Sequence, residues 1–171
     1  MNLKKNTPKL FCSITLITLF IVALVAAPAA AGEYAALDGV KQVKAVFDVT
    51  LESPQSANVV FGAVQNVYQD DSVRSLSDPP LVAVVFHGPA VKLISTNREG
   101  FDESDNRALD EFADMIRKMK ADGVTIEVCE YALKVLGVDP QTMLQEVDRV
   151  GNGFISVVGY QSQGYSVVTI N

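Results

Sequence analysis

The stretch "LVAVVF" (residues 81–86) is apolar at every position and rich in β-branched side chains. A run without polar alternation is typical of a strand that is buried on both faces of a parallel sheet. Parallel neighbours require crossover connections, which are usually helices. The stretch therefore predicts an α/β protein with helices on both sides of its sheet.

Sequence on either side of this strand has the expected helical patterns. "VKAVFDVTL" (43–51) is predicted to be the first strand. Ser53 and Pro54 then form an N-cap and a first helical residue, and apolar residues recur at helical spacing as far as Tyr68. "NRALDEFADMIRKMKADG" (106–123) has the pattern of an amphipathic helix that ends in basic residues and glycine.

The second half of the chain continues the alternation. We expect a strand at 124–128, a helix at 129–137, a helical turn at 139–140, partial helix at 151–165 and a last strand at 166–170. Such alternation indicates right-handed crossovers between parallel strands. The predicted fold is a three-layer α/β/α sandwich with a mostly parallel sheet of about five strands.

The N-terminus has the features of an export signal. Three lysines lie within the first nine residues, and an apolar run covers residues 10–25. Ala29 and Ala31 then satisfy the small-x-small rule of signal peptidase, which predicts a signal peptide over 1–31 that is cleaved after Ala31. The alternative is an uncleaved membrane anchor, for which the apolar run is barely long enough.

Processing would leave a short N-terminal arm (32–42) and one domain (43–171). Without the three lysines, the 14 basic residues fall to 11 against 20 acidic ones, so the net charge is −9. An acidic surface of this kind argues against nucleic acid or anionic lipid as a partner. We expect a periplasmic protein that meets the membrane only through its signal segment.

Cys129 is the one cysteine that would remain, because Cys12 lies inside the predicted signal peptide. An intramolecular disulfide is then excluded. In an oxidising compartment a single thiol is buried and inert, paired between chains, or used chemically.

The position of Cys129 favours a chemical use. In an open α/β sheet, ligands bind beyond the carboxyl ends of the strands, where both Cys129 and the single histidine, His87, are expected. A helix N-terminus stabilises a thiolate, whereas the carboxylates of Glu127 and Glu130 oppose it. His87 could orient or deprotonate a thiol or ligand, although a histidine that ends a strand is often structural.

Other chemistries have little support in the sequence. No serine lies in a nucleophile elbow, and one His and one Cys far apart lack the paired spacing of metal ligands. "GNGF" (151–154) lacks the glycine spacing and the lysine of a phosphate loop. We therefore expect neither a bound metal nor a cofactor.

Three stretches together resemble the DsrE/DsrF-like family, especially its exported single-domain branch. They are "VVFHGPAVKLI", "GVTIEVCEYALKVLGV" and "GNGFISVVGYQSQGY". They match a strand that ends in His-Gly, a Gly-Val-strand-Cys, and a Gln-x-x-Gly-aromatic before the last strand. The resemblance covers roughly residues 41–170, and Asn66 falls at a recurrent asparagine.

The resemblance implies a five-stranded parallel sheet and assembly as a homo-oligomer, a trimer or hexamer. It also implies sulfur oxidation or sulfur relay, with sulfur held as a persulfide on Cys129, which would act as a carrier more than as an enzyme with turnover. Its partners would be a sulfur donor or an acceptor thiol protein.

In that reading His87 is the neighbour of the thiol, and the expected ligand-binding residues are Gly88, Asn66, Glu130 and Gln161. The alternative is a non-catalytic oligomeric module that binds a small ligand and in which the cysteine is structural.

Overall fold

The computed structural model describes residues 34–171. Its centre is a five-stranded, all-parallel sheet with the order β4-β3-β2-β1-β5. The strands are β1 (Lys44–Val49), β2 (Leu81–Phe86), β3 (Thr125–Cys129), β4 (Asp148–Val150) and β5 (Ser166–Ile170). The predicted signal peptide and its cleavage site lie outside the described residues.

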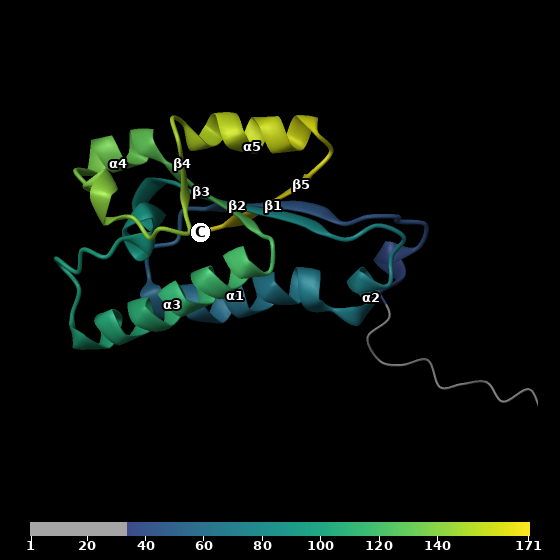
Figure 1. Cartoon of the computed structure of the whole chain (residues 1–171), viewed down its shortest axis with the longest axis horizontal. Coiled ribbons are helices and arrows are strands. Elements are labelled where there is room, and N and C mark those ends of the chain that lie inside the picture. Colours follow the sequence, from purple (N-terminus) through teal and green to yellow (C-terminus); the bar gives the residue numbers. More distant parts are fainter. Residues whose placement is uncertain (1–33) are drawn as a thin grey trace, which may run out of the picture. The chain divides into compact units, whose positions relative to one another are not determined.

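Helices cover both faces of the sheet, which gives the predicted three-layer α/β/α fold (Figure 1). Helices α1 (Pro54–Gln69) and α3 (Glu103–Ala121) lie on one face, and α5 (Gly153–Ser162) lies on the other. The right-handed crossover rule explains this division. The chain moves from β1 through β2 and β3 to β4 in one direction, and α5 then carries it back across the sheet to β5.

Shorter helical segments complete the domain. They are α2 (Asp71–Arg74), α4 (Glu130–Leu136) and three 3₁₀ helices, η1 (Ala35–Leu37), η2 (Gly88–Ile94) and η3 (Pro140–Thr142). Between residues 34 and 171, no helix combines the length and the apolar character that are needed to cross a membrane.

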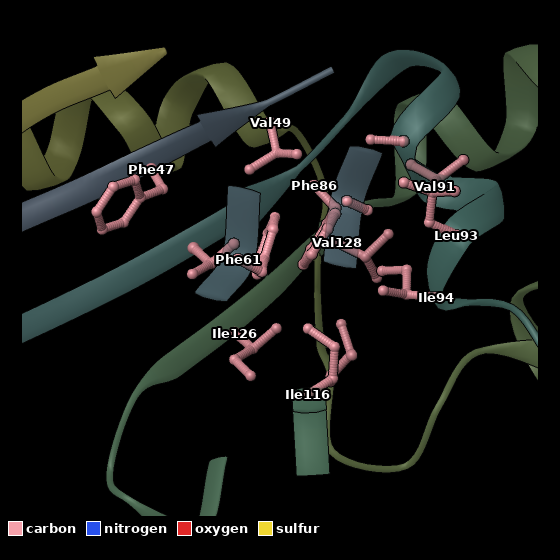
Figure 2. Packing of buried hydrophobic residues seen from close by; sticks show 14 of the residues in the cluster. Phe47, Val49, Phe61, Phe86, Val91, Leu93, Ile94, Ile116, Ile126 and Val128 are labelled. Carbon is pink, nitrogen blue, oxygen red and sulfur yellow. The ribbon is translucent and has the colours of Figure 1, made fainter. Parts of the chain in front are cut away.

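The larger core lies between the sheet and the α1/α3 layer (Figure 2). The ring centroid of Phe61 lies 5.6 Å from that of Phe86 and 4.8 Å from that of Phe112, which joins α1, β2 and α3 in one aromatic cluster. Stacked and edge-to-face aromatic pairs add to the stabilisation that area burial alone provides.

A smaller core lies under α5. Val46, Ala83 and Val85 point to this face, while the alternate residues of β1 and β2 point to the larger core. All residues of β2 except Leu81 are buried, which confirms the double-sided strand predicted from "LVAVVF". Of the long helices, α5 alone packs on this face of the sheet, whereas α1 and α3 pack on the opposite face.

The predicted strands and the two long helices are confirmed with small shifts. Ser53 caps α1, and its Oγ accepts the amide hydrogen of Ser56. Helix α3 begins at Glu103 rather than 106, because the side chain of Asp102 caps it by accepting the amide hydrogen of Asp105.

Candidate functional site

Cys129 and His87 lie side by side at the carboxyl ends of adjacent strands. Phe86 pairs with Val128 in the β2–β3 register, so His87 and Cys129, the residues that follow them, lie at neighbouring positions. A Cβ atom built on Gly153, the first residue of α5, would lie 3.1 Å from Cβ of Cys129 and 3.4 Å from Cβ of His87. Both side chains therefore begin directly beneath Gly153, at the start of α5.

The two residues line a cleft of about 210 Å³. The lining residues are His87, Gly88, Cys129, Tyr131, Ala132, Val135, Leu136, Asn152 and Phe154. Cys129 is only 3% exposed, so the thiol forms part of the cleft wall rather than of the outer surface. Reaction at this thiol requires a reagent that fits between α4 and the start of α5.

His87 is oriented by Asp48, a residue of β1 that sequence reasoning did not place in the site. Its Nε2 atom forms a partly buried hydrogen bond with Oδ1 of Asp48. The edge of the imidazole also meets the ring of Phe154, with 4.9 Å between the centroids. In neutral His87 this arrangement places the Nε2 proton towards the carboxylate and leaves the lone pair on Nδ1.

Glu127, one of the two acids that could oppose a thiolate, is held by α5. Its Oε1 atom accepts a hydrogen bond from the Tyr160 hydroxyl at 2.8 Å, while its Oε2 atom is buried without a partner. Burial, and then the bond to Glu127, raise the pKa of Tyr160, so this hydroxyl keeps its proton and remains a donor.

Glu130, the second acid, is exposed and lies 3.5 Å from Nε of Arg149, measured from its Oε1 atom. Arg149 is therefore the counter-charge of this carboxylate. Glu130 thus lies at the start of α4, beside the cleft, but does not line it.

The other predicted ligand-binding residues divide into two groups. Gly88 lines the cleft, where its positive φ of 53° allows the turn from β2 into η2. Asn66 lies on α1 in a separate hollow with Tyr34 and Val73, and Gln161 is exposed in the last turn of α5. The structure does not bring Asn66 or Gln161 to the cleft.

Within residues 34–171, no group of three or more His, Cys, Asp or Glu side chains is close enough to hold an ion.

Comparison with models of known protein families shows which family the chain belongs to. The model of the DsrE/DsrF-like family matches residues 38–170, which is nearly all of the described domain. The chain belongs to the DsrE/DsrF-like family. A search of curated proteins finds no match to this DsrE-like chain.

Two solved structures share the fold of this DsrE-like domain. MTH1491 from Methanobacterium thermoautotrophicum, a protein of unknown function, has 19% identity and a TM-score of 0.58, over 74% of this chain and 98% of its own. The ychN protein from E. coli has 13% identity and a TM-score of 0.51, over 75% of this chain and 100% of its own.

Proposed function

We propose that this DsrE-like protein is an exported sulfur carrier that holds sulfur as a persulfide on Cys129. The observation that carries the proposal is the placement of Cys129 and the Asp48–His87 pair around one cleft at the carboxyl ends of the parallel strands. A family related to sulfur relay supports the same conclusion.

The sulfur-transfer step needs no cofactor. His87 accepts the thiol proton at Nδ1, and Asp48 stabilises the imidazolium that results. The Cys129 thiolate then attacks the outer sulfur of a donor X–S⁻, in which X is the leaving group. The new Sγ–S bond forms as the S–X bond breaks, and X leaves with the bonding electron pair. Thiosulfate would release sulfite in this way and leave a persulfide on Cys129.

The proposal is tested by native mass spectrometry of the mature protein. After exposure to thiosulfate, inorganic polysulfide or an organic hydropersulfide, the wild type should gain the mass of one sulfur atom. Cys129→Ser should gain none. If the wild type shows no adduct beyond that of Cys129→Ser with any of these donors, the carrier function is excluded.

The burial of the thiol favours a second candidate, a non-catalytic module that binds a small ligand. Cys129 would then be a packing residue, as buried cysteines often are. This candidate predicts that the thiol resists iodoacetamide in the folded protein and that Cys129→Ser keeps its assembly. Rapid alkylation of the folded wild type would rule it out.

Export and assembly belong to the same proposal. The mature protein would begin after Ala31, act in the periplasm and form a homo-oligomer. N-terminal sequencing of the protein recovered from a periplasmic fraction tests the cleavage directly.

A further inference from the structure

The walls of the cleft carry little charge. Tyr131, Val135 and Leu136 of α4 form one wall, and Phe154 of α5 lies opposite, against His87. Of the described residues that line the cleft, none is lysine or arginine, and the cation nearest in sequence, Lys134, is not among them. The single amide, Asn152, already uses its Oδ1 atom to accept the amide hydrogen of Phe154.

An anionic donor would be poorly stabilised in this cleft. A charged group that leaves water needs a counter-charge or several hydrogen bonds, and its transfer is otherwise costly. Thiosulfate and inorganic polysulfides carry negative charge, as do Asp48, which bonds His87, and the exposed Glu130, which follows Cys129 in the chain. The predicted mature chain, with a net charge of −9, adds long-range repulsion of anions.

We infer that the cleft selects uncharged sulfur donors with an apolar group, namely organic hydropersulfides R–S–SH in their protonated form. The inference rests on the proposed function of Cys129 as a sulfur carrier. The Cys129 thiolate attacks the outer sulfur, the bond between the two donor sulfurs breaks, and R–S⁻ leaves with the electron pair. The product is Cys129–S–SH, while the leaving thiolate takes the proton that His87 received.

A matched pair of donors tests the charge preference. Ethyl hydropersulfide and 2-sulfonatoethyl hydropersulfide present the same reacting sulfur and differ by one negative charge on the organic group. The rate of one-sulfur addition to Cys129 is measured by mass spectrometry for each donor and divided by its rate with 2-mercaptoethanol. We expect a normalised preference of at least about tenfold for the ethyl donor, which is the effect of leaving one polar group without a partner.

A charge placed on the cleft wall supplies the second test. Val135 is exposed on α4, so Val135→Lys adds a cation beside the cleft without disturbing the core, and sedimentation shows whether the variant keeps the assembly of the wild type. The variant should lose most of the preference for the ethyl donor. Val59→Lys, at an exposed position of α1 in the other helical layer, is the matched control and should keep it.

The outcomes separate the inference from the proposed function. Equal normalised rates for the two donors, or a preference for the sulfonate, would overturn the inference and leave the carrier function intact. An unchanged preference in Val135→Lys would also overturn it. If neither hydropersulfide adds sulfur to Cys129 while thiosulfate or polysulfide does, the inference fails and the carrier function stands. If no donor of any kind adds sulfur, the carrier function itself fails.

Discussion

Gly153 is the residue on which the close approach of α5 to the site depends. A Cβ atom at this position would lie 3.1 Å from both Cβ of Cys129 and Cγ1 of Val85. Neither neighbour is the flexible end of a long side chain, so an added methyl group requires a shift of a few tenths of an ångström in the packing of α5 against the strands. The start of α5 can cover the thiol because residue 153 has no side chain.

Substitution of Gly153 is therefore expected to lower the stability of the fold. Gly153→Ala should lower the free energy of unfolding by about 1–3 kcal/mol through overpacking. Gly159→Ala, in the same helix and with no atom within 4 Å of its added Cβ, should raise it by about 0.5–1 kcal/mol. Urea unfolding of the two variants is the measurement. If Gly153→Ala is as stable as Gly159→Ala, the contact is not tight.

Asp48 provides a second test at the residue scale. Asp48→Asn keeps the shape of the side chain but removes the charge that stabilises the imidazolium of His87. We expect sulfur addition to Cys129 to slow by roughly ten- to a hundredfold at pH 7, the range in which positioned acid–base groups contribute. A mass-spectrometric time course measures the rate, and circular dichroism checks the fold. An unchanged rate would mean that His87 does not act on the thiol.

The sequence predicted part of this site and missed the rest. His87 and Cys129 could be placed together because both follow apolar strands that end at the same edge of a parallel sheet. Asp48 was not predicted, because its partner is 39 residues away in the chain and strand pairing alone brings them together. A signal was present: a carboxylate within an apolar strand needs a partner, as Glu127 also does.

At the scale of elements, the carboxyl-terminal ends of α1 and α3 are tied by one polar cluster. The Tyr68 hydroxyl donates to Oδ2 of Asp122 at 3.0 Å, and Nζ of Lys118 lies 2.7 Å from the same oxygen. Burial, and then the bond to Asp122 and its charge, raise the pKa of Tyr68 to about 12. The phenol therefore stays neutral in the fold at pH values where an unfolded tyrosine ionises.

This shift predicts how stability changes in alkali. Below pH 10, Tyr68 is neutral in both the folded and the unfolded chain, and its contribution to stability is complete. As the pH rises from 10 to 12, the unfolded chain loses the proton first, so the contribution is lost. Wild type should therefore lose more stability than Tyr68→Phe over this interval in urea titrations. Parallel losses in the two proteins would contradict the shift.

Length and burial decide which elements were predictable. The long helices α1 and α3 and the buried strand β2 have a strong period or an unbroken apolar run. Strand β4 could not be predicted, because "DRV" is three residues long and none of them is buried. Its strand character comes from pairing with β3 at the sheet edge, a contact that local sequence cannot encode.

At the scale of the whole domain, exposed apolar side chains are concentrated on one side. Of the eleven large apolar residues that are exposed within 34–171, six lie on α4 and α5. We call them the α4–α5 apolar face: Tyr131, Val135, Leu136, Phe154, Ile155 and Val158. Exposed apolar side chains that gather on two helices of one side mark an interaction site more often than a solvated surface.

The α4–α5 apolar face predicts the behaviour of the protein in solution. If it joins copies of the chain, the wild type should sediment as a trimer or hexamer, because burial of these side chains stabilises the assembly. Ile155→Glu combined with Val158→Glu places two charges in that interface and should give a folded monomer. Both residues are exposed, 72% and 61%, so the substitutions leave the core of the domain unchanged.

Val59→Glu supplies the control for that experiment. Val59 is 78% exposed on α1, away from the α4–α5 apolar face, and a charge there should leave the oligomer intact. Sedimentation equilibrium gives the mass of each protein, and circular dichroism shows whether it is folded. A wild type that stays monomeric at high concentration would exclude the face as a contact between copies. Dissociation by Val59→Glu but not by the double variant would instead place the contact on the α1/α3 layer.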